Sequence, residues 1–209
     1  EASNWGRVNG AAAYALKARA LLYRASKLNN PDGNTAYWAN AAQAAADFIT
    51  QNNKQSYPYR LYNTGNPEND YYECFTTNPV YNNEIILARS VWNTNQVEKV
   101  FLPVGFTGSF SGNGRTNPTQ NLVDAYEMSN GKRIDENGST YDAANPYKDR
   151  DPRLAQTIFY QGMMWGRADK EERRAIDVRY NSDADKGVDY TSAMGGTYTG
   201  YYLKKFVNN

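Results

Sequence analysis

Small and apolar residues recur at helical spacing through the first quarter of the chain. Over residues 6–28, alanine and leucine return every three or four positions, which is the period of one helix face. Residues 35–52 repeat this pattern with Trp38 on the apolar stripe, which predicts a core position for that ring. Between them, Pro31 and Gly33 stand in an asparagine-rich turn. The pattern predicts an antiparallel helical hairpin with small residues at the contact.

A second, shorter helix is predicted after residue 116. Asn117 is expected to be its N-cap, Pro118 suits the first turn, and Gln120 stands three residues after the cap, as a capping box requires. Asn130 and Gly131 offer the left-handed conformation that ends a helix. A helix of about ten residues is marginal alone, so packing must hold it in place.

The rest of the chain lacks long periodic segments. Short strands are predicted at residues 85–89, 154–160 and 176–180, and a glycine-rich loop at residues 105–114. That loop is no phosphate cradle, because its glycines do not join a strand to a helix that carries Lys-Ser/Thr. The predicted fold class is mainly α. Residues 1–54 form a tetratricopeptide-like hairpin, and residues 55–209 form an irregular, loop-rich ligand-binding region with short helices and a few short strands.

Composition narrows the functional classes. Lys+Arg 23 against Asp+Glu 22 leaves the chain nearly neutral, which argues against a nucleic-acid binder. The absence of histidine excludes His-dependent triads and the usual zinc sites, and the single Cys74 excludes an internal disulfide. The chain has 18 Tyr and 4 Trp among many Asn, Gly and Thr residues. Flat rings with polar tips beside amides suit neutral, hydroxyl-rich ligands.

Aromatic residues on predicted loops are the candidate ligand contacts. A ring that stacks on the C–H face of a sugar needs an open face and amide groups nearby. For each tryptophan the alternative is packing in the core, since most tryptophans are largely buried. The predicted ligand-binding residues are Trp92, Asn93, Asn95, Tyr71, Tyr72 and Trp165.

Two charged stretches are considered as an active site and as a metal site. Arg150 and Arg153 alternate with Asp149 and Asp151 around a proline, and we expect mutual ion pairs that lock a turn rather than an active site. The stretch with Asp183, Asp185 and Asp189 loosely resembles a calcium loop, but its glycine is misplaced for an EF-hand. No cofactor is predicted, and calcium remains the alternative.

Four signatures, in order along the chain, resemble the SusD/RagB family of outer-membrane nutrient-binding lipoproteins. They are Gly6-Arg7 ahead of the alanine-rich helix through Tyr23; Pro118-Thr119-Gln120 with Leu122-Val123-Asp124 and Tyr126-Glu127-Met128; Asp149-Arg150-Asp151-Pro152-Arg153; and Thr199-Gly200-Tyr201-Tyr202-Leu203-Lys204-Lys205-Phe206.

The resemblance implies a non-catalytic protein on the outer face of the outer membrane. It would bind an oligosaccharide or polysaccharide and pass it to a SusC-like TonB-dependent transporter. Contact with the membrane would come only through an N-terminal lipid anchor, and the lipid-bearing cysteine and the flanking helices are expected outside this chain. Two alternatives stay open: a peptide-binding, RagB-like uptake component, and a glycoside hydrolase that uses two carboxylates.

Overall fold

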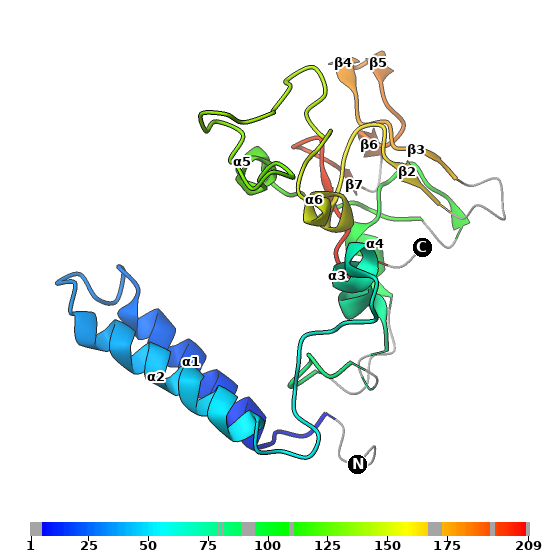
Figure 1. Ribbon diagram of the computed structural model, residues 1–209. Coiled ribbons are helices and arrows are strands. Elements are labelled where there is room, and N and C mark those ends of the chain that lie inside the picture. Colours follow the sequence, from blue (N-terminus) through cyan, green and yellow to red (C-terminus); the bar gives the residue numbers. More distant parts are fainter. Residues whose placement is uncertain are drawn as a thin grey trace. The chain divides into compact units, whose positions relative to one another are not determined.

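The computed structural model describes residues 6–78, 80, 82–88, 95–108, 111–166, 173–192 and 195–207. The chain divides into two compact units (Figure 1). Unit 1 comprises Glu1–Asn63 and Thr77–Trp92, and unit 2 comprises Thr64–Thr76 and Asn93–Asn209.

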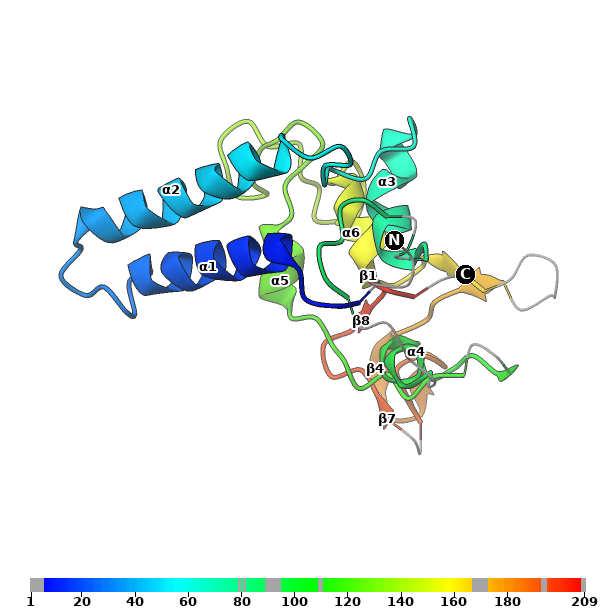
Figure 2. The ribbon, with the colours of Figure 1, turned by 90° about the horizontal axis from the view of Figure 1, so that it is seen from below.

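Unit 1 is built on the predicted hairpin. Helix α1, Gly10–Ala25, runs antiparallel to helix α2, Thr35–Asn52 (Figures 1 and 2). Asparagines start both helices: the side chain of Asn9 accepts from the Ala12 amide at 2.9 Å, and that of Asn34 accepts from the Ala36 amide at 3.0 Å. The buried hydrophobic residues of the two helices are alanines, namely Ala25, Ala41 and Ala44. Small side chains thus let the two helices approach closely.

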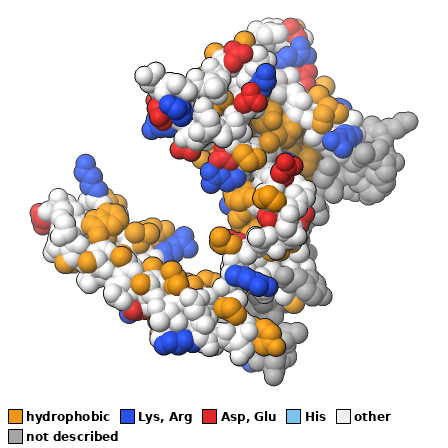
Figure 3. Space-filling view, viewed as in Figure 1, with side chains coloured by type: hydrophobic (Ala, Val, Ile, Leu, Met, Phe, Trp, Pro, Cys, Tyr) orange, Lys and Arg blue, Asp and Glu red, His pale blue; other side chains and the backbone are white. Residues whose placement is uncertain are grey.

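The outer faces of the hairpin are apolar and exposed. Trp38 is 50 % exposed, so the prediction of a core position is wrong for this chain. Two helices bury only the face that each turns to the other, and Trp38 lies outside that contact. Figure 3 shows apolar side chains along the hairpin, and the exposed ones include Leu16, Leu22 and Ile49.

Unit 2 combines short helices with two- and three-residue strands, as the predicted mainly α, loop-rich class requires. Its helices are α3 (Pro67–Thr76), α4 (Gln96–Phe101), α5 (Gln120–Ala125) and α6 (Pro152–Thr157). Its strands form four antiparallel pairs within the described part of the unit: β1 (Ile158–Phe159) with β8 (Tyr202–Leu203), β2 (Met164–Trp165) with β3 (Arg174–Ala175), β4 (Tyr180–Ser182) with β5 (Asp185–Lys186), and β6 (Thr191–Ser192) with β7 (Gly195–Gly196).

The pair β1–β8 separates two hydrophobic clusters. Successive strand residues point to opposite faces. Ile158 and Tyr201 therefore join one cluster, with Val123 and Leu154. Phe159 and Tyr202, which are paired in register, join the other. This second cluster also contains Leu102, Phe106, Trp165, Ile176, Val178 and Val207.

Gly114 shows why this core needs a glycine. Its φ is +52°, and a Cβ there would lie 2.1 Å from a ring carbon of the buried Tyr202. Any larger residue would push the Tyr202 ring out of place. The glycine therefore lets the loop before α5 pass directly over the core.

Three strand predictions differ from the structure. The described residues 85–88 are not in a strand. Residues 154–157 belong to α6, and only Ile158–Phe159 is extended. The strand expected at residues 176–180 is replaced by β3 before it and by β4, which begins at Tyr180. Helix α6 forms because the Asp151 side chain accepts from the Arg153 amide at 2.9 Å and Pro152 occupies the first turn.

The N-cap of the central helix was predicted two residues too early. Thr119, not Asn117, caps α5, and its hydroxyl accepts from the Leu122 amide at 3.3 Å. Asn117 instead donates to the Gly114 carbonyl at 2.8 Å. The helix also ends earlier than predicted, with Tyr126 at its C-cap.

The charged turn after residue 148 is only partly held by ion pairs. Arg153 pairs with Asp151, as predicted. Arg150 is buried, and its guanidinium donates to three backbone carbonyls, those of Val123, Tyr126 and Pro146. The prediction of mutual pairs is therefore wrong for Arg150, which fastens the turn to the end of α5.

Candidate functional site

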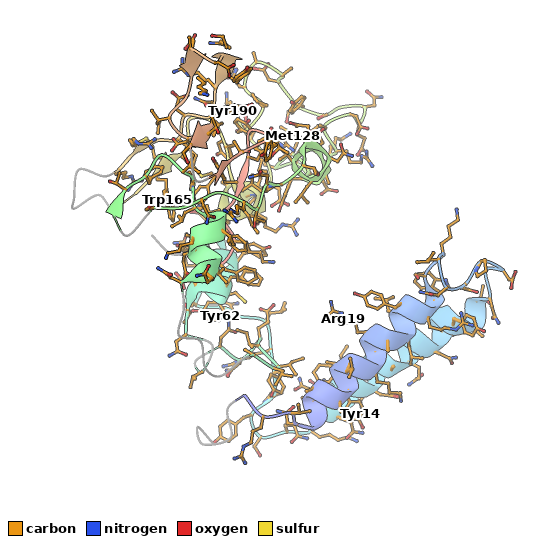
Figure 4. The ribbon with its side chains drawn as sticks, turned by 180° about the vertical axis from the view of Figure 1, so that it is seen from behind. Tyr14, Arg19, Tyr62, Met128, Trp165 and Tyr190 are labelled. Carbon is orange, nitrogen blue, oxygen red and sulfur yellow. The ribbon has the colours of Figure 1, made fainter. Side chains whose placement is uncertain are left out.

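A hollow of about 780 Å³ in unit 2 gathers aromatic and polar side chains. It lies at the two small strand pairs β4–β5 and β6–β7, with the segment before α5 on another side. Three tyrosines line it: Tyr180, Tyr190 and Tyr198. Tyr190 is labelled in Figure 4, in the part of unit 2 that carries these strands.

Ring stacking and hydrogen bonds of the backbone amides position these tyrosines. Tyr180 and Tyr190 stack with ring centroids 4.8 Å apart and an interplanar angle of 28°. The Thr197 amide donates to the Tyr190 carbonyl at 2.9 Å. The Tyr198 amide donates to the Asn117 side chain at 3.3 Å, while the Tyr198 ring is 96 % exposed. The hollow therefore offers one ring open to solvent beside a stacked pair.

A buried ion pair lies next to Tyr190 in the sequence. Asp189 is fully buried, and its carboxylate accepts from both terminal nitrogens of Arg174, at 2.6 and 2.9 Å. The same carboxylate accepts from the Asp177 amide at 2.8 Å. The Arg174 guanidinium lies 4.0 Å over the Phe106 ring. Because Tyr190 follows Asp189 directly, this network sets the position of the tyrosine.

Polar groups complete the lining. The Tyr180 hydroxyl donates to Asp183 at 3.4 Å, and the charge of Asp183 raises the pKa of Tyr180 above its ordinary value of 10.0. Tyr180 is therefore a neutral hydroxyl at physiological pH. Gly196 has no room for a side chain, since a Cβ there would lie 2.4 Å from the Tyr190 carbonyl oxygen. Thr191 and Ser192 contribute hydroxyl groups, while the side chains of Asn117 and Thr197 bond to the backbone and shape the wall.

Unit 1 has a hollow of its own, of about 510 Å³, at the open end of the hairpin. Tyr14, labelled in Figure 4, lines it with Asn9, Asn52 and Tyr59. Its amides are already engaged: Asn52 makes two bonds of 2.8 Å to the Tyr59 backbone, and Asn9 donates to the Tyr59 hydroxyl at 3.0 Å. These bonds hold the loop that follows α2. The hollow in unit 2 is larger and is lined by a stacked pair of tyrosines, so it is the better candidate for a ligand site.

Comparison with known proteins places the chain in a family. A family model described as "SusD family" matches residues 50–209. The chain belongs to the SusD family. None of the curated proteins compared with the chain matches it.

Two solved structures share the fold of this SusD-family chain. One is a SusD-like protein from Bacteroides fragilis, with a TM-score of 0.65 and 23% identity, covering 100% of this chain and 38% of that chain. The other, the selenomethionine form of BT4246, has a TM-score of 0.64 and 19% identity, covering 98% of this chain and 46% of that one. The chain thus spans less than half the length of either protein. None of the helices in the described ranges has the length and apolar character needed to cross a membrane.

Two of the predicted site residues of this SusD-family chain, Tyr72 and Trp165, meet at the Lys204 ammonium, which lies 5.4 Å over the first ring and 6.0 Å over the second. Trp92 and Asn93 lie outside the described residues. Asn95 is exposed at the start of α4, and its side chain makes no capping bond there. None of these three lines the hollow in unit 2 as it is described. Their predicted contact with ligand stays a prediction.

Trp165 belongs to the hydrophobic core. Its side chain is 2 % exposed, and its ring packs against Phe159 with centroids 4.7 Å apart (labelled in Figure 4). A ring sealed in this way has no face for a sugar. The prediction of a ligand contact is corrected to a packing role.

Tyr71 and Tyr72 lie on α3 and are partly buried against the C-terminal segment. The Tyr72 hydroxyl donates to the Val207 carbonyl at 3.3 Å, and the Lys204 ammonium lies 5.4 Å over the Tyr72 ring. Tyr71 meets the edge of Phe75 at 5.1 Å. The pair is therefore not an open loop platform, and its contact with ligand remains a prediction.

The calcium alternative loses one of its ligands. Asp189 is engaged with Arg174, while Asp183 is exposed. Across the part of the chain that the structure describes, no group of three or more acidic or cysteine side chains is placed to hold a metal ion. The spacing of the three aspartates therefore reflects a buried ion pair and a hairpin turn.

Proposed function

We propose that this SusD-family chain is part of a non-catalytic protein that binds oligosaccharide or polysaccharide. The observation that carries the proposal is the tyrosine hollow, where an open ring lies beside a stacked pair within a rim of amides and hydroxyls. Aromatic faces pack on the C–H surfaces of sugar rings, and the amides and hydroxyls bond to their hydroxyl groups. The hollow lies in the region 55–209, which we propose as the ligand-binding region.

The lining of the hollow favours binding over hydrolysis. Glycosidases place two carboxyl groups on either side of the scissile bond. Among the described residues that line this hollow, Asp183 is the single carboxylate. It also accepts from the Tyr180 hydroxyl and lies 4.0 Å from the Lys186 ammonium. A pair of acids is thus not supplied here, which supports a role without cleavage.

The wider role rests on membership of the family. We propose that the full-length protein is lipid-anchored at the outer face of the outer membrane and delivers glycan to a SusC-like TonB-dependent transporter. A peptide-binding, RagB-like uptake role is the second candidate, because tyrosine rings beside hydroxyl groups also suit peptide backbones.

Glycan binding by the chain tests the proposal. We expect retention of an oligosaccharide on a glycan array, with no release of reducing sugar. Tyr198→Ala should raise the dissociation constant about tenfold, since it removes the open ring. Because Tyr198 is 96 % exposed, the variant should keep its stability.

Tyr23→Ala is the matched control. Tyr23 is an exposed tyrosine on α1 that does not line the hollow, so its loss should leave binding unchanged. Equal binding by the wild type and Tyr198→Ala would exclude this hollow as the site. Trp92→Ala would then test the predicted contact of Trp92 as the alternative.

A further inference from the structure

Arg115 places a charged group in the hollow. It lies among the lining residues and is exposed, and within the described part of the chain its guanidinium has no ion-pair partner. Four other arginines of unit 2 differ in this respect. Each pairs with an aspartate: Arg133 with Asp135, Arg153 with Asp151, Arg174 with Asp189 and Arg179 with Asp177.

The segment that carries Arg115 is fixed on both sides. The Thr116 amide donates to the Val100 carbonyl at 3.0 Å, and the Thr116 carbonyl accepts from the Leu203 amide at 3.3 Å. On the other side, Gly114 lies against the Tyr202 ring, which leaves no room for movement toward the core. Arg115 is therefore presented to the hollow from a rigid base.

The charges in the hollow do not balance. Lys186 and Asp183 lie 4.0 Å apart and largely offset each other. The described lining then keeps one net positive charge, at Arg115. A planar guanidinium has the donor geometry that matches both oxygens of a carboxylate.

We propose that this hollow selects oligosaccharides that contain a uronic acid, with the sugar ring on the tyrosines and its carboxylate on Arg115. The inference rests on the proposed glycan-binding function and specifies the class of sugar. Neutral sugars would still use the rings and the amides. The carboxylate adds a charge-assisted contact with Arg115, the one guanidinium among the described residues that line the hollow.

The test compares a uronate oligosaccharide with its carboxyl-reduced counterpart of the same length and linkage. By calorimetry with the whole chain at low ionic strength, the uronate should bind about fivefold or more tightly. The difference should shrink in about 0.5 M salt, because added salt shortens the distance over which exposed charges attract each other.

Arg115→Gln should remove the preference for the uronate, so that the two sugars bind with similar dissociation constants. Arg115→Lys keeps the charge without the planar fork and should retain only part of the preference. Arg133→Gln removes an equal charge elsewhere in unit 2, from a residue that does not line the hollow, and should keep the preference intact.

The outcomes separate this inference from the function on which it rests. Equal binding of the two sugars, unaffected by Arg115→Gln, would overturn the uronate inference and leave glycan binding standing. Failure of both sugars to bind would overturn both. Binding of an acidic peptide that depends on Arg115, without sugar binding, would replace the uronate with a peptide ligand.

Discussion

Arg150 shows how one buried side chain fastens two separate segments. Its Nη1 donates to the Pro146 carbonyl at 2.8 Å, and its Nη2 donates to Val123 at 2.7 Å and to Tyr126 at 2.8 Å. The last two carbonyls lie at the end of α5, where the Val123 carbonyl also accepts from the Tyr126 amide at 3.3 Å. A guanidinium meets three acceptors at once because its donors form a planar fork.

Removing the Arg150 guanidinium should destabilise the protein. We expect Arg150→Met to lower the free energy of unfolding by about 3 kcal/mol, because buried carbonyls lose their donors. Arg150→Lys should lose nearly as much, since one ammonium cannot reach all three oxygens. Urea unfolding measures both.

Arg153 is the matched control for Arg150. Its side chain is 58% exposed and its partner is one carboxylate, so Arg153→Met should cost less than about 1 kcal/mol. Equal losses at the two positions would mean that the turn is held by general charge effects rather than by the carbonyl contacts of Arg150.

At the scale of elements, the start of α5 depends on a hydroxyl. Thr119→Ala should lower the free energy of unfolding by about 1 kcal/mol, because the Leu122 amide loses its acceptor. Thr119→Val keeps the shape without the oxygen and should cost as much, whereas Thr119→Ser and Thr119→Asp should restore stability. Thermal unfolding of the four variants checks this, and a Val variant as stable as the wild type would contradict it.

Long elements were predictable from the sequence and short ones were not. The hairpin α1–α2 has two long stripes of small residues and strong breakers between them, so its period is clear. Strands of two residues leave no period to detect. For α6, the signal of a capping aspartate followed by proline was present at Asp151, but the alternating charges favoured a turn instead.

The candidate hollow escaped prediction for a related reason. Tyr180, Tyr190 and Tyr198 lie in a stretch with no motif, and the small strand pairs β4–β5 and β6–β7 bring them together. The general abundance of tyrosine was visible, but the particular rings were not. Trp165 was misassigned because its loop-like surroundings in sequence give no sign of the core that Phe159 and Tyr202 build around it.

At the scale of the whole molecule, the two units differ in how much apolar surface they bury. Unit 2 contains both clusters of large buried side chains, including Trp165, Phe159 and Tyr202. The buried hydrophobic residues of α1 and α2 are alanines, while Leu16, Trp38 and Ile49 are half or more exposed. Opening a segment costs less free energy where less apolar surface is buried.

Hydrogen exchange should therefore be faster in the helices of unit 1 than in the core strands of unit 2. We expect backbone amides in the middle of α1 and α2 to exchange about tenfold or more faster than those of β1 and β8. Trp165→Ala should remove about 3–5 kcal/mol of stability from unit 2, as loss of a large core ring does, and erase the protection of β1 and β8. Because Trp165 packs within the unit 2 cluster, α1 and α2 should keep their wild-type rates. Slow exchange throughout the hairpin in the wild type, lost together with β1 and β8 in the variant, would instead show that the chain opens as one cooperative body.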